Sequence, residues 1–291
     1  MLPDEILSAI KSYGREIEWA TDYLEITSIT GGSINQAVLV KTDTLSFFLK
    51  YNTASLHPKM FSSEFMGLEL LAQTKSLRIP KPLFIHEGEQ YSCILMEYIE
   101  ESPYCVNFWE IFAKQLAELH QNSADYFGLH FPNYMASLPQ SNVPHQNFVE
   151  FFINERLEPQ IKIARNKGYL NNEHLRQLER LYKELFSIIP TEKPALTHGD
   201  LWSGNLMCDK KGMPVVMDPA VYFGHRELDI AMTTMFGGFS PLFYKTYQEI
   251  YPMEKSWEER LAFYNLYPIL IHINLFGNSY LPYFERVLQR F

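Results

Sequence analysis

The chain has 291 residues, of which 46% are hydrophobic and 20% charged, and its formal net charge is −9. This composition is that of a folded globular protein and excludes a mostly disordered chain. The acidic balance argues against nucleic acid as the main partner. The three cysteines form no CxxC pair, so the sequence predicts neither a structural zinc site nor a disulfide framework, and a cytoplasmic location is the simplest expectation. The first residues, MLPDEILSAIKSYG, lack the apolar run of a secretory signal.

The first third of the chain is predicted to be a strand-rich lobe with one prominent helix. A short helix is expected over residues 1–14, with Gly14 as its stop. Apolar residues at helical spacing predict the prominent helix over residues 58–74. Extended segments are expected at 24–30, 37–41, 45–51, 83–86 and 91–96.

After residue 96 the pattern becomes mostly helical. Helices are expected at 108–122, 146–166 and 171–188 and in several segments from 226 onward, with short strands at 206–208 and 214–217. The polar connector that follows Met96 predicts an N-terminal lobe of residues 1–96, a C-terminal lobe of residues 97–291, and a hinge at about 96–101. Residues 261–284 carry no Asp, Glu, Lys or Arg, but their asparagines, prolines and glycine favour a buried helical hairpin over a membrane span.

The strongest chemical signal is the stretch HGDLWSGN at 198–205, followed by an apolar strand that ends at Asp218. Phosphoryl transfer to an alcohol needs a carboxylate that receives the hydroxyl proton, and oxygen ligands that hold Mg²⁺ against the phosphates. Asp200 is placed to be the proton-accepting carboxylate, and Asn205 and Asp218 are placed to supply the oxygen ligands of Mg²⁺. Each of these residues alone is an ordinary turn residue, but the whole pattern predicts an ATP-dependent kinase.

A second signal lies upstream, where Lys50 ends an apolar strand and Glu64 follows on a helix. A strand lysine paired with a helix glutamate presents one positive charge to the nucleotide phosphates. Between two strands before Lys50, the turn Gly31-Gly32-Ser33 offers backbone amides to phosphate. Most two-glycine turns are only hairpins. This turn indicates a phosphate site only because it lies one strand before the strand of Lys50.

Several polar residues have two interpretations. The charged residues at 225–229 open an apolar helix, either as ordinary helix-start charges or, for Arg226 or Asp229, as braces of the catalytic loop. His198 is expected to hold that loop rather than act as a base. His272 lies in the apolar C-terminal segment, either as a buried core histidine or at a substrate pocket. His120 ends a helix and calls for no special account.

The stretches HGDLWSGN (198–205), MDPAVYFGHRELDIAM (217–232), NFVEFFINERLEPQIKIA (147–164) and NLFGNSYL (274–281) resemble the fructosamine kinase, or ketosamine-3-kinase, family. That family shares a fold with aminoglycoside phosphotransferases and choline kinases. The resemblance implies an α+β, two-lobed, protein-kinase-like fold, with a small antiparallel sheet and one main helix in the N-terminal lobe.

The resemblance also implies an activity and its residues. The expected reaction is ATP- and Mg²⁺-dependent phosphorylation of the 3-hydroxyl of ketosamines, on small amines or on proteins, which leads to deglycation. Asp200 would be the base, and Asn205 and Asp218 the metal ligands. Trp202 and His272 would face the substrate, and the backbone of Met96, Glu97, Tyr98 and Ile99 would meet adenine. Ser33 departs from the cysteine that several members carry in the glycine turn, and Pro219 departs from the Asp-Phe-Gly of protein kinases.

Two alternatives stay open at this point. One is another alcohol kinase of the same fold, acting on aminoglycosides or amino alcohols. The other is a non-catalytic nucleotide-binding module, which the presence of all five kinase residues disfavours. The sequence leaves open the preferred sugar and amine, the choice between a free and a protein-bound substrate, the oligomeric state and any regulation.

Overall fold

The computed structural model describes residues 2–19, 24–29 and 34–291. Contacts divide the chain into two compact units, of which the first comprises Met1–Val106 and Met207–Asp218 and the second Asn107–Leu206 and Pro219–Phe291. The predicted boundary at residues 96 and 97 therefore differs from the unit boundary at Val106, and the first unit also takes in a segment from much later in the chain. The expected hinge at 96–101 stays a prediction.

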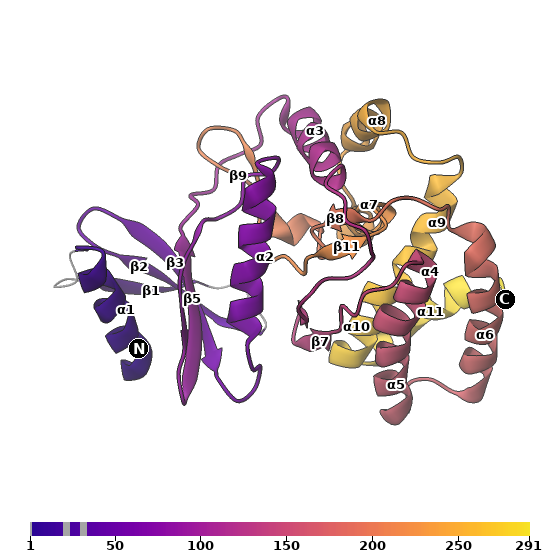
Figure 1. The fold of residues 1–291 in the computed structure, drawn as a ribbon, viewed down its shortest axis with the longest axis horizontal. Helices are drawn as coiled ribbons and strands as arrows, with labels where there is room; N and C mark the ends of the chain where they lie inside the picture. The colour runs from indigo at the N-terminus through magenta and orange to yellow at the C-terminus, as the bar shows by residue number, and fades with distance from the viewer. Residues whose placement is uncertain (1, 20–23, 30–33) are drawn as a thin grey trace. The chain divides into compact units, whose positions relative to one another are not determined.

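The first unit is built on one antiparallel sheet with the strand order β1-β2-β3-β5-β4 (Figure 1). Each predicted extended segment corresponds to one of these strands, which confirms the expected N-terminal sheet. The strands are β1 (Glu25–Ile29), β2 (Gln36–Lys41), β3 (Ser46–Thr53), β4 (Pro82–Glu87) and β5 (Tyr91–Glu97).

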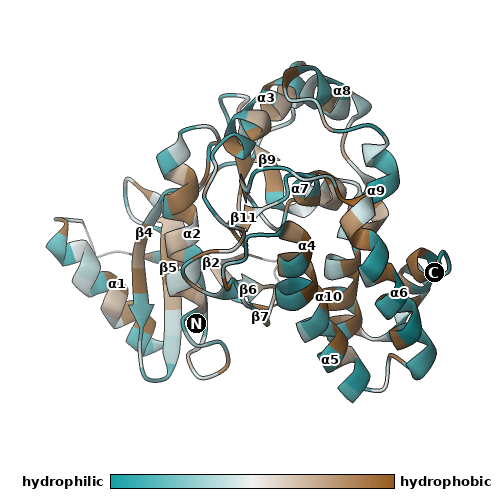
Figure 2. Cartoon of the chain, turned by 45° about the vertical axis from the view of Figure 1, so that its right-hand side comes forward, coloured by the Kyte–Doolittle hydropathy of each residue, from teal (hydrophilic) through white to brown (hydrophobic). Residues whose placement is uncertain are grey.

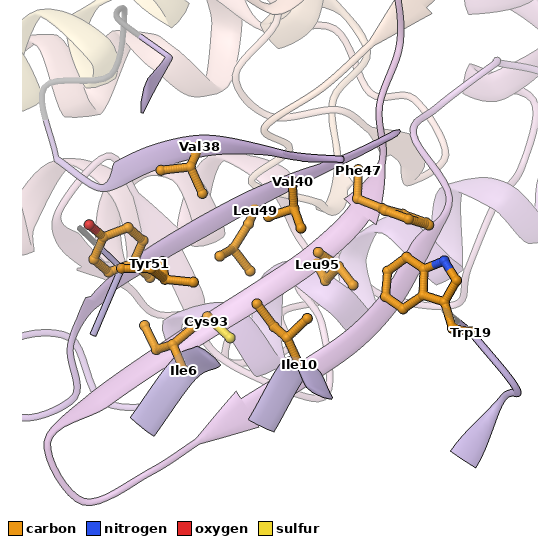
Figure 3. Close-up of a cluster of buried hydrophobic side chains, with 11 residues drawn as sticks. Ile6, Ile10, Trp19, Val38, Val40, Phe47, Leu49, Tyr51, Cys93 and Leu95 are labelled. Carbon is orange, nitrogen blue, oxygen red and sulfur yellow. The ribbon is translucent and has the colours of Figure 1, made fainter. Parts of the chain in front are cut away.

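Helix α1 (Asp4–Glu16) covers one face of this sheet. Ile6 and Ile10 of α1 pack on a cluster that includes Leu49 of β3 and Leu95 of β5 (Figure 3). Because strand residues alternate between faces, this packing turns the intervening residues of β3 and β5 to the opposite face. The expected stop at Gly14 was wrong, since α1 runs through the buried Gly14 to Glu16.

Helix α2 (Met60–Thr74) contacts β4 and β5 and buries Phe61, Leu68 and Leu71. It is the prominent helix that the apolar spacing predicts. Lys50 and Ile94 are paired across β3 and β5, on the face opposite the α1 cluster. The side chain of Lys50 is therefore placed on the α2 face by simple strand alternation.

The second unit is mainly helical, with short two-stranded sheets formed by β6 with β7 and by β8 with β11. Helix α3 packs against α8, and α10 packs against α5. The strands are β6 (Asn133–Met135), β7 (Leu138–Gln140), β8 (Ala195–Thr197) and β11 (Tyr222–Gly224). Strand β9 (Leu206–Cys208) pairs with β10 (Pro214–Val216), and apart from Leu206 these two strands belong to the first unit. The helices are α3 (Phe108–His120), α4 (Phe148–Phe151), α5 (Glu158–Asn166), α6 (Asn172–Ile188), α7 (Glu227–Thr233), α8 (Pro241–Ile250), α9 (Trp257–Tyr264), α10 (Leu266–Phe276) and α11 (Leu281–Leu288).

Two details of the second unit bear on the predictions. The helix expected over 146–166 is interrupted by a π-helical segment, Phe152–Leu157, between α4 and α5. The uncharged segment 261–284 supplies the end of α9, the whole of α10 and the start of α11. Helix α10 is mostly buried and strongly hydrophobic (Figure 2). Among the described residues, no helix is both long and apolar enough to cross a membrane.

Candidate active site

Lys50, Glu64 and Asp218 form a buried charged group in the first unit. The Lys50 ammonium donates to Glu64 Oε1 at 2.7 Å and also forms an ion pair with Asp218. Lys50 is only 6% exposed. Burial alone would lower the pKa of this lysine, but the charges of Asp218 and Glu64 outweigh burial and raise it. Lys50 is therefore held as a cation.

Asp218 follows β10 with a φ of 57°, in the left-handed region that a residue with a side chain rarely adopts. Its side chain is 44% exposed although it pairs with the buried Lys50. A backbone held in an unfavourable region is typical of functional positions. One carboxylate oxygen pairs with Lys50, and the other provides a hard donor that suits Mg²⁺.

Asp200 and Asn205 meet on one loop of the second unit. Asn205 donates through Nδ2 to the Asp200 carbonyl at 2.8 Å and to Asp200 Oδ2 at 3.0 Å. A short 3₁₀ turn over Ser203–Asn205 brings the amide back to the aspartate. Since Nδ2 is used in this way, Oδ1 is the atom of Asn205 that can bind a cation.

The loop that carries Asp200 is braced by Asp229 of α7. The Asp229 carboxylate accepts hydrogen bonds from the backbone N–H of His198 at 2.7 Å and of Gly199 at 2.9 Å. Gly199 has a φ of 82°, and a Cβ there would lie 2.1 Å from the carbonyl oxygen of Ala220, so only glycine fits. The sequence left open whether Arg226 or Asp229 braces this loop. In the structure Asp229 does so.

The other predicted brace, Arg226, has different partners. It forms a two-pronged ion pair with Glu192 and donates to the carbonyls of Tyr251 and Pro252. These contacts fix α7 to its neighbours rather than to the loop. His198 accepts from the N–H of Asp200 at 3.3 Å through Nδ1, which confirms that this histidine helps to hold the loop.

His120 was missed by sequence reasoning. It is fully enclosed at the end of α3, and its Nε2 lies 3.1 Å from the Asp229 carboxylate while its Nδ1 lies 2.7 Å from the Tyr247 hydroxyl. Burial would raise the pKa of Asp229, but the hydrogen bond and charge of His120, with the neighbouring His198 and Gly199, outweigh burial and lower it. No local pattern marks such a contact, since 109 residues separate the two partners.

Trp202 and His272 lie in one aromatic group. The ring of Phe236 is 5.6 Å from that of Trp202 and 5.1 Å from that of His272, centroid to centroid. His272 Nδ1 lies 2.7 Å from the Pro268 carbonyl, so Nδ1 carries the proton in the neutral ring. Burial lowers the pKa of His272. His272 is half-buried, is linked to Trp202 through the ring of Phe236, and is not enclosed in the core.

The remaining predicted nucleotide contacts fall into two sets. Gly31, Gly32 and Ser33 lie outside the described residues. Glu97, at the end of β5, accepts from Arg78 at 2.7 Å, and its own N–H donates to the Lys81 carbonyl at 2.9 Å. The backbone N–H of Glu97 is therefore engaged within the sheet.

Comparison with known proteins places these features in one family. A family model described as fructosamine kinase matches residues 8–291. A protein of Enterococcus faecium named a probable ketoamine kinase is 37% identical over 273 residues, which cover 92% of this chain and 95% of that protein. The chloroplastic protein-ribulosamine 3-kinase of Arabidopsis thaliana is 37% identical over 270 residues, covering 90% and 80%.

Solved structures agree with this match. The crystal structure of a protein provisionally named a fructosamine-3-kinase, from Haemophilus somnus, has a TM-score of 0.85 and 29% identity, over 96% of this chain and 95% of that one. An aminoglycoside phosphotransferase, at 14% identity and a TM-score of 0.63 over 97% and 98% of the chains, shares the fold. The kinase-like α+β fold is thereby confirmed, and membership in a kinase family implies the use of ATP. By its sequence over nearly the whole length and by its fold, the chain belongs to the fructosamine kinase family.

Proposed function

We propose that this protein transfers the γ-phosphoryl group of ATP to the 3-hydroxyl of ketosamines, the adducts that sugars form with amines. The observation that carries this proposal is the match to the fructosamine kinase family over residues 8–291. All the residues that phosphoryl transfer requires are present in this chain. The names of the similar proteins, ketoamine kinase and protein-ribulosamine 3-kinase, support the same substrate class.

In this proposal Asp200 orients the 3-hydroxyl and receives its proton. The hydrogen bond from Asn205 and the braced backbone of the two preceding residues fix the carboxylate of Asp200 before the substrate binds. Preorganisation of this kind lowers the barrier because no reorientation is needed during the reaction. Lys50, kept charged by Glu64 and Asp218, stabilises the negative charge on the phosphates.

Mg²⁺ is the cofactor that the donor atoms fit. Asn205 Oδ1 and the Asp218 carboxylate are hard oxygen donors, and one or two protein ligands with phosphate oxygens are the usual set for this ion. When bound, the metal neutralises charge that develops on the transferred group. Gly31, Gly32 and Ser33 would cradle the phosphates. Adenine would meet the backbone of Met96–Ile99. Because the Glu97 N–H already donates to the Lys81 carbonyl, the N–H that adenine uses would belong to another residue of this segment.

Phosphorylation at O3 prepares the adduct for breakdown, which releases the amine. The activity is therefore one of repair, on small amines or on protein side chains. We also propose a cytoplasmic location, the simplest expectation for a chain whose three cysteines form no CxxC pair. No role is proposed for nucleic acid or membranes.

The test is a coupled ADP assay with Mg-ATP and a panel of ketosamines that varies the sugar and the amine separately. Turnover of at least one ketosamine, lost in Asp200→Asn, is expected. An aminoglycoside and a simple amino alcohol serve as alternative acceptors, and turnover of these alone would contradict the proposed substrate class.

A further inference from the structure

A run of aromatic side chains leads away from Trp202 within the second unit. Ring centroids lie 5.6 Å apart for Trp202 and Phe236, 5.1 Å for Phe236 and His272, and 4.8 Å for His272 and Tyr280. The run continues from His272 to Phe276 at 5.6 Å and from Tyr280 to Tyr283 at 6.5 Å. We call these residues the aromatic track: Trp202, Phe236, His272, Phe276, Tyr280 and Tyr283.

The track exposes much of its ring surface. Phe236 is 48% exposed, Phe276 55% and Tyr283 56%. Single exposed hydrophobic residues are ordinary, but a contiguous set on one surface marks a site of binding. Its inner end is Trp202, which lies on the same loop as Asp200, two residues further on.

Phe236 has an unfavourable backbone conformation. Its φ and ψ are 54° and 42°, in the left-handed region, and it is followed by Gly237 and Gly238 with φ of 106° and 73°. A bulky L residue is a clear outlier there, and glycine would adopt the same conformation without strain.

The chemistry of the ketosamine, which accepts the phosphoryl group, indicates what the aromatic track binds. This inference rests on the proposed function. In a ketosamine the nitrogen is bonded to C1, two carbons from the C3 hydroxyl that Asp200 would deprotonate. A secondary alkylamine carries a proton near neutral pH, so a cation and its substituent must lie close to the catalytic loop. Aromatic faces attract alkylammonium groups, and alkyl stems pack along them.

The histidine and the outer end of the track fit this assignment. The Nδ1 of His272 donates to the Pro268 carbonyl, and burial lowers the pKa of the ring, which disfavours the charged form that would repel a cation. The guanidinium of Arg286 already lies 5.8 Å from the ring centroid of Tyr283. The rings that remain for a substrate cation are therefore those nearer to Trp202.

We propose that the aromatic track binds the amine substituent of the ketosamine, and that it favours a long alkyl substituent on the protonated nitrogen, such as the stem of a lysine side chain in a peptide. A methylamine adduct would reach only the inner end of the track. A lysine adduct would extend along Phe236 and His272 toward Phe276 and Tyr280.

The experiment compares two ketosamines of the same sugar, one made from methylamine and one from the lysine side chain of a short blocked peptide. The measured quantity is the ratio of kcat/KM for the peptide adduct to kcat/KM for the methylamine adduct. In Phe276→Leu and Tyr280→Leu, which keep apolar bulk and lose the ring, this ratio should fall by about tenfold. Tyr280→Phe keeps the ring and should preserve the ratio.

Phe186→Leu is the matched control, since Phe186 is an aromatic residue of α6 with 54% exposure outside the track. Its ratio should equal that of the wild type, and thermal melting of each variant verifies folding. An unchanged ratio in Phe276→Leu and Tyr280→Leu, with active wild type, overturns the track and leaves the proposed function intact. Failure of the wild type to phosphorylate either adduct overturns both.

Discussion

At the scale of single residues, Asp200 and Asn205 depend on each other. The Asn205 amide holds both the carbonyl and the carboxylate of Asp200, and this leaves a proton acceptor whose position is fixed. Asp200→Asn preserves the size and the loop contacts but removes the basic oxygen. We expect kcat to fall by about 10²–10⁴-fold, while the Kd for ATP, measured by titration calorimetry, stays near the wild-type value. A near-normal kcat would show that Asp200 is not the base.

Asp218 combines two roles, as partner of the Lys50 cation and as proposed metal ligand. Asp218→Ala should weaken Mg²⁺-dependent ATP binding by about tenfold or more, because one hard oxygen donor is lost. The measurement is ATP affinity as a function of Mg²⁺ concentration. Asp218→Asn, which retains one oxygen donor, should lie between the alanine variant and the wild type. Identical Mg²⁺ curves for all three proteins would contradict the ligand role.

At the scale of elements, α7 and the end of α3 hold the catalytic loop through Asp229 and His120. The pKa of Asp229 is lowered in the folded protein. Its stabilising contribution is therefore fully present above the unfolded-state pKa of about 4 and is lost as pH falls through the lower folded value. Asp229→Asn should lose about 3 kcal/mol of stability at pH 7 and should also have a lower kcat.

Urea unfolding at several pH values tests whether the stabilising contribution of Asp229 is lost as the pH falls. The wild type should lose more stability between pH 5 and pH 3 than Asp229→Asn loses, because the variant has no carboxylate to protonate. Asp125→Asn, an exposed aspartate of the same unit, serves as control and should follow the wild type. Parallel pH curves for the wild type and Asp229→Asn would contradict the assignment.

The π-helical segment Phe152–Leu157 places Arg156 fully inside the second unit. Its guanidinium carbon lies 4.0 Å from the centroid of Tyr222 and 4.5 Å from that of Phe151, and Nη2 donates to Asn142 at 2.7 Å. Lysine has neither the planar fork nor the stacking surface. Arg156→Lys should therefore destabilise the protein by about 2 kcal/mol in urea unfolding. Arg165→Lys, at an exposed site on α5, should change stability by less than about 0.5 kcal/mol.

At the scale of the whole molecule, the net charge of −9 acts differently on the two proposed substrates. Mg-ATP is an anion and the ketosamine amine is a cation, so long-range forces oppose one encounter and favour the other. Raising the ionic strength from about 10 to 150 mM shortens the Debye length from about 30 to 8 Å. We expect kcat/KM to rise about twofold for Mg-ATP and to fall about twofold for the ketosamine. A salt effect of the same sign on both would contradict this argument.

Some features could be predicted from sequence because they rest on local patterns. Strand alternation in residues 46–53 sets Lys50 opposite Leu49 and Tyr51, and apolar spacing marks α2. The three-residue strands β6, β7, β8 and β11 were not predicted, whereas β9 and β10, which are equally short, were predicted beside the Asp200 motif. The π-helical insertion and the contact of His120 with Asp229 depend on tertiary packing. For the same reason the sequence left the brace open between Arg226 and Asp229.

The composition of the first unit has a consequence for synthesis. A ribosome makes residues 1–106 well before residues 207–218, yet both segments belong to that unit. Until the later segment emerges, Lys50 lacks Asp218 and Arg78 lacks Asp209. An amino-terminal fragment that ends at Val106 is therefore an incomplete domain, and exchange of this unit between relatives must transfer both segments together.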